Sequence, residues 1–132
     1  MNKRVVGIII KGGKILLMRR IRNGREYFVF PGGGIEGNES LENGVAREIK
    51  EEFNLDVKIN KFLFQIENRG RQEFYFLIEK FSGVPKISGD EKKRMNESNQ
   101  YYPVWKDLEE IPNLSNLHPK EAKQKVKEMI LD

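Results

Sequence analysis

Residues 31–55 read PGGGIEGNESLENGVAREIKEEFNL and join a glycine-rich segment to a helix. Pro31 and the glycines after it leave the backbone free to adopt conformations that other residues avoid. From about Glu39 the pattern changes, and apolar residues recur at every fourth position: Leu41, Val45, Ile49 and Phe53. This spacing predicts an amphipathic helix over residues 39–53, which begins with acidic and capping residue types. Asn54 tolerates the left-handed conformation in which many helices end.

Strand patterns precede this segment. Three short β-branched and aliphatic runs occupy residues 4–11, 14–22 and 26–30. The pairs Gly12-Gly13 and Asn23-Gly24 separate them, and both pairs are typical of tight hairpin turns. We therefore expect an N-terminal meander of three strands that stops at Pro31.

Further strands and a second helix follow the first helix. Aromatic-rich runs at 57–67 and 73–81 flank an Arg69-Gly70-Arg71 turn, a long polar segment covers 82–99, and one more strand is expected at 101–106. Pro119 suits the first turn of a helix that runs to about residue 131. Strands and helices interleave without a regular βαβ alternation. We predict one α/β domain over residues 1–132, with a mixed β-sheet sandwiched between α-helices.

Composition limits the chemistry that this chain can perform. Its 132 residues include no Cys and one His. The chain therefore has no thiol nucleophile, no Cys-ligated zinc and no multi-histidine metal site. Any metal must be a hard cation held by oxygen ligands.

The charge balance fits two classes of protein. The net charge is +4 and the pI is about 9.3, which suits a nucleic-acid binder and equally an enzyme for a phosphate anion. The apolar run at 5–10 is far shorter than the ~20 residues that span a membrane and shorter than a signal-peptide core. We expect a cytoplasmic protein without membrane contact, and the sequence leaves its oligomeric state open.

Carboxylates gather on one side of the predicted helix. Glu48, Glu51 and Glu52 stand at positions i, i+3 and i+4. At ~100° per residue, Glu52 projects into the apolar sector and Glu48 lies at its edge, while Arg47 falls on the solvated side. An ordinary charged helix face would instead point its acids to water.

Acids at the rim of a core require a compensating cation. Arg47 could serve Glu51 at i+4 or reach back to Glu39, but one guanidinium cannot neutralise four acids. A divalent cation can, and Mg²⁺ commonly bridges carboxylates to substrate phosphates. Glycines allow backbone to approach a ligand closely, so the helix and the segment before it predict a phosphate-handling site.

Written as a motif, the segment is Gly33-x5-Glu39-x7-Arg47-Glu48-Ile49-x-Glu51-Glu52-x-Asn54-Leu55. It resembles the Nudix box, G-x5-E-x7-R-E-U-x-E-E-x-G-U, at every fixed position except Asn54. Asn is the residue that best replaces a helix-ending glycine. The order of strands, the Phe30-Pro31 lead-in and a late Tyr-x-x-x-Trp strand also resemble small MutT-type members.

The resemblance implies roles for the residues of the box. Glu48, Glu51 and Glu52 would hold Mg²⁺ or Mn²⁺, with the Gly33 carbonyl as a candidate additional ligand. Arg47 and Glu39 would form the ion pair that orients the catalytic helix. Nudix enzymes cleave nucleoside diphosphates linked to another group X by attack of water on phosphorus, and Glu52 or Glu48 is the first choice for general base.

Residues around the box complete the expected site. Arg20 matches a position where relatives often bind phosphate, and the remaining candidates for substrate contact are Phe30, Gly32 and Gly34. Most of the aromatic residues should be core, although one or two could stack on a nucleobase. Many relatives use an extra Glu outside the box, and Glu91 and Glu97 are the candidates here, although either could be a solvated loop acid.

The leading hypothesis is a metal-dependent pyrophosphohydrolase whose substrate is a small nucleotide such as a (d)NTP. The same chemistry on ADP-ribose, a dinucleoside polyphosphate or a capped RNA end is the close alternative. A third possibility is a non-catalytic Nudix module that binds a nucleotide or RNA. Such modules tend to lose carboxylates of the box, whereas this chain keeps them all.

Overall fold

The computed structural model describes residues 2–132, apart from the side chains of Asp90 and Glu91. Its first sheet has the strand order β5 (Gly32–Gly34), β1 (Lys3–Ile8), β7 (Arg71–Ser82) and β6 (Asp56–Asn68). Strands β1 and β7 are parallel, whereas β1 pairs with β5 and β7 pairs with β6 in antiparallel register. The sheet is therefore mixed, as predicted.

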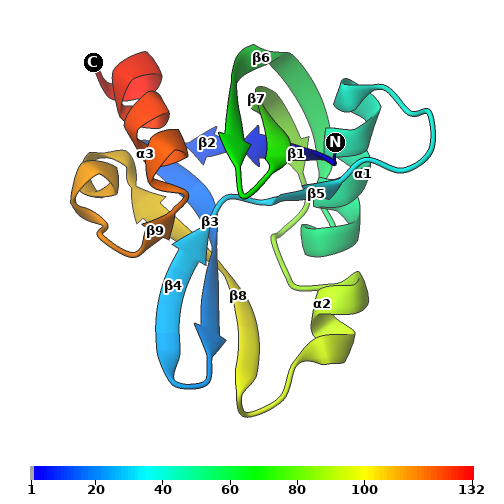
Figure 1. Cartoon of the computed structure of the whole chain (residues 1–132), viewed down its shortest axis with the longest axis vertical. Helices are drawn as coiled ribbons and strands as arrows, with labels where there is room; N and C mark the ends of the chain where they lie inside the picture. Colours follow the sequence, from blue (N-terminus) through cyan, green and yellow to red (C-terminus); the bar gives the residue numbers. More distant parts are fainter. Residues whose placement is uncertain (1) are drawn as a thin grey trace.

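The second sheet carries the hairpin that extends away from the first (Figure 1). Its order is β2 (Ile10–Lys11), β3 (Lys14–Arg22), β4 (Arg25–Val29) and β9 (Leu117–His118), and β8 (Asn99–Asp107) also pairs with β3. Asn23 and Gly24 connect β3 to β4 with φ values of 51° and 79°. These left-handed conformations confirm the predicted hairpin turn.

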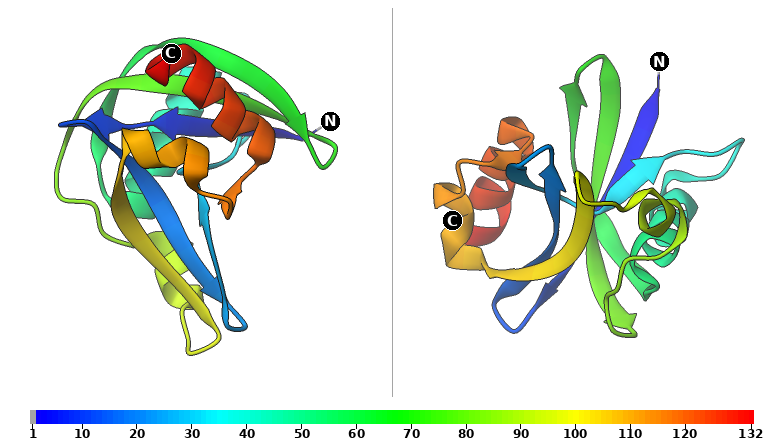
Figure 2. Two further views of the ribbon diagram at one scale, coloured as in Figure 1. Left: turned by 90° about the vertical axis from the view of Figure 1, so that its left-hand side faces the viewer. Right: turned by 90° about the horizontal axis from the view of Figure 1, so that it is seen from below.

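Helices cover the first sheet on both sides. Figure 2 shows α1 (Leu41–Phe53) and α2 (Gly89–Arg94) on one side and α3 (Lys120–Val126) on the other. A 3-10 helix, η1 (Leu108–Asn113), follows β8, and α3 continues into a short π-helix, η2 (Lys127–Leu131). None of the helices in the described part of the chain is long and apolar enough to cross a membrane.

The core is divided between the two faces of the first sheet. One cluster packs beneath α1 and includes Val45, Ile49 and Phe53. The other packs beneath α3 and includes Ala122 and Val126. Alternate residues of β1 and β7 supply both clusters, because successive strand side chains point to opposite faces.

Three details of the predicted architecture were wrong. The run at 4–11 is interrupted at Ile9, so that β1 joins the first sheet while β2 pairs with β3 in the second. The predicted three-strand meander forms from β2, β3 and β4, but its first strand keeps only two residues, and β1 pairs far along the chain. The glycine-rich segment forms β5, and the long polar segment contains α2. Each of these features depends on pairing or packing with distant residues, which local patterns do not record.

Candidate active site

Helix α1 has the ends that its sequence predicts. The Ser40 hydroxyl accepts a hydrogen bond of 3.1 Å from the Asn43 N–H, which satisfies a donor of the first turn. Asn54 adopts the left-handed conformation, with φ 58° and ψ 38°, and its N–H donates to the Lys50 carbonyl at 2.9 Å. The substitution of Asn for the glycine of the box therefore preserves the end of the helix.

The burial of the helix carboxylates agrees with the positions predicted from helical geometry. Glu52 is 5% exposed, and the side chain of Glu48 is 16% exposed. The Glu51 side chain is 53% exposed, as expected for its position furthest from the apolar sector. Arg47 was wrongly placed on the solvated side, because its guanidinium folds over the acids and leaves the side chain only 20% exposed.

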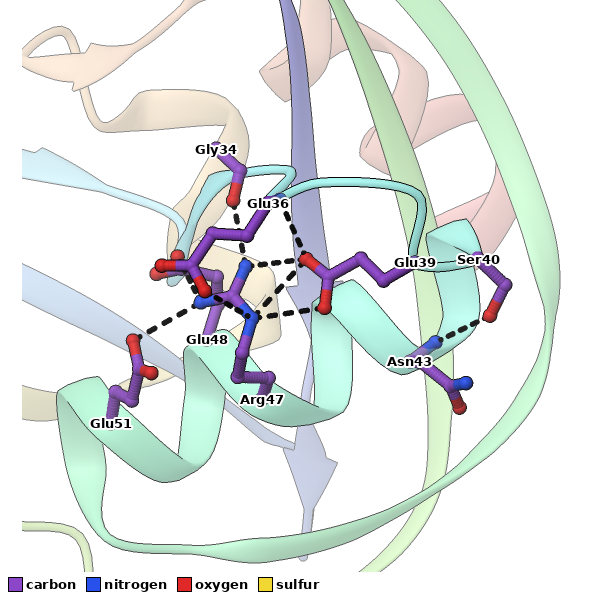
Figure 3. Close-up of polar contacts among 8 residues, drawn as sticks. All are labelled: Gly34, Glu36, Glu39, Ser40, Asn43, Arg47, Glu48 and Glu51. Carbon is purple, nitrogen blue, oxygen red and sulfur yellow. Dashed lines mark hydrogen bonds and ion pairs between the residues drawn. The ribbon is translucent and has the colours of Figure 1, made fainter.

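Arg47 lies at the centre of the acidic cluster, which consists of Glu39, Glu48 and Glu51 (Figure 3). Its Nη2 donates to Glu39 Oε1 at 2.6 Å and to the Gly34 carbonyl at 2.8 Å. Its Nη1 donates to Glu48 Oε1 at 2.9 Å and to Glu51 Oε2 at 3.1 Å. The two alternative contacts predicted for this side chain, with Glu51 and with Glu39, therefore form together.

This hydrogen bonding changes the acidity of the partners. The side-chain hydrogen bond from Arg47, assisted by the backbone N–H of Glu36, lowers the pKa of Glu39 from 4.5 to about 2. The hydrogen bonds to Glu39 and Glu48 raise the pKa of Arg47, and the attraction of both carboxylates adds to this shift. The ion pair between residues 39 and 47 is thus fixed in its charged form at neutral pH.

The glycine-rich strand brings backbone against the acids. A Cβ atom built on Gly33 would meet the carboxylate of Glu48, and one built on Gly32 would meet the Val5 carbonyl. Only glycine allows these two close approaches. Gly34 contributes its carbonyl to Arg47. Phe30, just before this strand, is 3% exposed and packs edge to face with Tyr75 at 5.8 Å, so that its role as a substrate contact stays a prediction.

The donor set suits a hard divalent cation. Carboxylate oxygens and a bare peptide at Gly33 are the ligand types that Mg²⁺ and Mn²⁺ prefer, and the cradle between Gly33 and Glu48 would be filled by any side chain at position 33. In the part of the chain that the structure describes, no three acidic or His side chains converge on one point. Instead, Glu48 and Glu51 both bind Nη1 of Arg47. A metal at this position would have to compete with that guanidinium.

The end of α1 is covered by the segment that leads into α2. The Ser88 hydroxyl donates to the Glu51 carbonyl, and the Ser88 N–H donates to the Glu52 carbonyl at 3.0 Å. The Lys86 N–H donates to the Phe53 carbonyl at 3.2 Å. Three of the carbonyls that a helix end leaves without intrahelical partners are satisfied here. The sequence showed only a long polar segment in this region and gave no sign of this capping.

Arg20 lies on β3, between two aromatic rings. Its guanidinium carbon is 4.3 Å from the ring centroid of Tyr101 and 5.5 Å from that of Tyr27. Its Nη2 donates to the Tyr101 hydroxyl at 2.9 Å and to Asn99 Oδ1 at 3.4 Å. Sequence reasoning missed Tyr27, Asn99 and Tyr101, because only the pairing of β3 with β4 and β8 brings them to Arg20.

The two candidate acids outside the box are placed differently. Glu97 is exposed in the turn before β8. The side chain of Glu91 lies outside the described residues. The role of either acid as a base or ligand stays a prediction.

Comparison with known proteins identifies the family. Residues 1–128 match the NUDIX domain, and the chain therefore belongs to the Nudix family. An ADP-ribose pyrophosphatase of Methanocaldococcus jannaschii is 32% identical over 123 residues, which are 88% of this chain and 68% of that protein. An 8-oxo-dGTP diphosphatase of Buchnera aphidicola is 32% identical over 83 residues, which are 60% of this chain and 64% of that protein.

A solved structure supports the same assignment. The solution structure of the E. coli ORF135 protein has a TM-score of 0.75 and 25% identity, and the match covers 99% of this chain and 90% of that one. Family, relatives and fold together make the chain a Nudix hydrolase, an enzyme that acts on phosphoric anhydride bonds. Hydrolases of this family generally use a divalent metal.

Proposed function

We propose that this enzyme is a Mg²⁺-dependent pyrophosphohydrolase that acts on a nucleoside triphosphate, either ordinary or oxidised. The observation that carries the proposal is the cluster of acids around Arg47 directly beside the bare peptide of Gly33. The relative named 8-oxo-dGTP diphosphatase supports a triphosphate substrate. Because the acids of the box are all present, the geometry favours an enzyme over a non-catalytic nucleotide-binding module.

Each residue of the box has its own proposed role. Glu48, Glu51 and Glu52 would hold the cation, with the Gly33 carbonyl as an additional ligand. When bound, Mg²⁺ supplies Lewis acidity and neutralises charge on the diphosphate. Glu39 and the Gly34 carbonyl would keep Arg47 in place when a cation is bound.

Hydrolysis also requires a group that accepts the proton of the attacking water. Glu52 is the first candidate because the residue is 5% exposed on the face of α1 that meets the sheet, and Glu48, whose side chain is 16% exposed, is the second. A carboxylate within hydrogen-bond reach of the attacking water can act as its general base. Phe30, Gly32 and Gly34 are the proposed contacts for the rest of the nucleotide.

ADP-ribose is the second candidate substrate, because a relative at 32% identity is named ADP-ribose pyrophosphatase. One panel separates the candidates: (d)NTPs, oxidised dNTPs, ADP-ribose, dinucleoside polyphosphates and a 5′-capped RNA, each assayed for kcat/KM with Mg²⁺, with Mn²⁺ and with EDTA. We expect the highest kcat/KM for a triphosphate, no turnover in EDTA, and loss of turnover in Glu51→Gln. Full turnover in Glu51→Gln or in EDTA would contradict the proposed mechanism.

A further inference from the structure

The segment between β7 and α2 lies against the C-terminal end of α1, and in Figure 1 it descends to α2 below that helix. The Ser88 hydroxyl donates to the Glu51 carbonyl, and the Ser88 N–H donates to the Glu52 carbonyl at 3.0 Å. The Lys86 N–H donates to the next carbonyl of the helix at 3.2 Å. Three consecutive carbonyls thus accept hydrogen bonds from one short segment, residues 86–89, which we call the helix clamp.

The side chain of Ser88 serves α1, although the residue precedes α2. Ser88 occupies the N-cap position of α2, where a serine hydroxyl usually accepts a hydrogen bond from the helix that follows it. Its backbone is extended, with φ −144° and ψ 176°, but its hydroxyl makes no capping hydrogen bond to α2 among the described residues. It donates to the Glu51 carbonyl instead. The serine therefore fastens the helix that carries the acids.

The backbone of the helix clamp approaches α1 closely at Gly89. The φ of Gly89 is 65°, and a Cβ atom built on it would lie 3.0 Å from the Glu51 carbonyl oxygen. Both observations favour glycine, since other residues rarely adopt this φ and a methyl group would press against the end of the helix. Ile87 packs against the core cluster beneath α1 and so anchors the clamp.

The helix clamp acts on the turn of α1 from which Glu51 and Glu52 project. Arg47 holds the acids through their side chains and through the Gly34 carbonyl, and these contacts leave the main chain of the last turn untouched. The last carbonyls of a helix have no partners within it, so that this end frays unless other groups bind it. Because a displacement of about 1 Å in a catalytic group can cost 100-fold in rate, fixing this turn matters for the chemistry.

We propose that the helix clamp positions Glu51 and Glu52 for cation binding and catalysis, and that Ser88 is a positioning residue for the reaction. This inference rests on the roles proposed above for the two acids. Ser88 acts through main-chain carbonyls, so that loss of its hydroxyl should affect kcat and cation affinity while KM is maintained.

The test removes the Ser88 hydroxyl and keeps both main-chain donors. In Ser88→Ala we expect kcat to fall about tenfold with KM changed less than about twofold, since the remaining bonds limit the displacement of the acids. Ser88→Thr keeps the hydroxyl, and its β-branched side chain suits the extended backbone, so that kcat should stay within about twofold of the wild type. Ser82→Ala, which removes an exposed serine at the end of β7, is the matched control.

Two further measurements on the same variants do not depend on turnover. Calorimetric titration should show Mn²⁺ affinity at least about threefold weaker in Ser88→Ala, with Ser88→Thr and Ser82→Ala unchanged. In the metal-free protein, amide hydrogen exchange at positions 86 and 88 should accelerate about tenfold in Ser88→Ala, because the end of α1 opens more often. The melting temperature should stay within a few degrees of the wild type.

The outcomes separate positioning from a general contribution to stability. A lower melting temperature with unchanged kcat and Mn²⁺ affinity would show that the clamp only stabilises the fold, and it would overturn the proposal. Equal losses in Ser88→Ala and Ser88→Thr would overturn it as well, because the hydroxyl would then be unimportant. If the wild-type enzyme hydrolyses no nucleotide, the proposed function fails instead. Mn²⁺ affinity and amide exchange then test the clamp by the same criteria.

Discussion

Arg47 on α1 and Arg20 on β3 are both half-buried and both make several hydrogen bonds, yet their surroundings are opposite. Arg47 contacts carboxylates that lie 1, 4 and 8 residues away along the chain. Arg20 contacts neutral side chains 79 and 81 residues away. The first guanidinium contacts Glu48 and Glu51 of its own helix and Glu39 just before it. The second contacts an amide oxygen, a hydroxyl and two aromatic rings.

The two arginines therefore lie in different parts of the molecule's polar surface, which are built in different ways. The acids around Arg47 lie within 8 residues of it along the chain, and one guanidinium faces three carboxylates. The surroundings of Arg20 form only when β3, β4 and β8 pair, and they include the neutral side chains of Tyr27, Asn99 and Tyr101. We propose that the chemistry takes place beside Arg47 and that Arg20 contributes to substrate binding.

The largest effect is expected on kcat and KM, which separate a role in chemistry from a role in substrate binding. Glu52→Gln should lower kcat about a thousandfold with little change in KM, because the buried carboxylate acts on the reacting water or cation. Arg20→Gln should instead raise KM about tenfold. Steady-state kinetics on the best substrate measures both, and Glu42→Gln, an exposed acid in the first turn of α1, is the matched control. A kcat loss of equal size in Arg20→Gln would refute the division.

A second prediction concerns the backbone beside the acids. In Gly33→Ala the new methyl group meets the Glu48 carboxylate, which can turn aside with little cost in stability. We expect a melting temperature close to that of the wild type but about 100-fold lower activity, since misplacing a catalytic group by about 1 Å has this order of effect. Gly34→Ala, whose Cβ would meet nothing within 4 Å, should show a smaller loss. Equal losses would show that the contact with Glu48 is unimportant.

The smallest effect concerns pH. Because the pKa of Glu39 falls from 4.5 to about 2 on folding, the unfolded chain binds more protons between these values. The stabilisation by this carboxylate is complete above about 4.5 and is lost as the pH falls toward about 2. The melting temperature of the wild type should therefore exceed that of Glu39→Gln at neutral pH, and the gap should close over this interval. A gap that stays constant would contradict the pairing with Arg47.

Features of the fold that neighbouring residues decide could be predicted from the sequence. The periodicity of α1, its Asn54 end and the turn at Asn23-Gly24 were predicted because each is decided by neighbouring residues. The division of the strands between two sheets was not, because β1 pairs in parallel with β7, about 70 residues away along the chain. Nothing near Ile9 in the sequence shows that the run of residues 4–11 changes sheet there.

In the site, too, local features could be predicted and long-range contacts could not. Helical geometry placed Glu52 toward the core and Glu48 at its edge, and the structure agrees. The spacing of residues predicted contacts of Arg47 with Glu51 or Glu39, and both form. The contact with the Gly34 carbonyl was not predicted, because it depends on where β5 lies. The surroundings of Arg20, assembled from β3, β4 and β8, left no local signal apart from Arg20 itself. That one domain spans residues 1–132 stays a prediction.

The proposed mechanism requires that the carboxylates now bound to Arg47 can hold a divalent cation. A calorimetric titration of the protein with Mn²⁺, without substrate, tests it most directly. We predict saturable binding by the wild type and affinity at least tenfold weaker in Glu48→Gln, with the Glu42→Gln control unchanged. Equal Mn²⁺ affinity in the wild type and Glu48→Gln would contradict the claim.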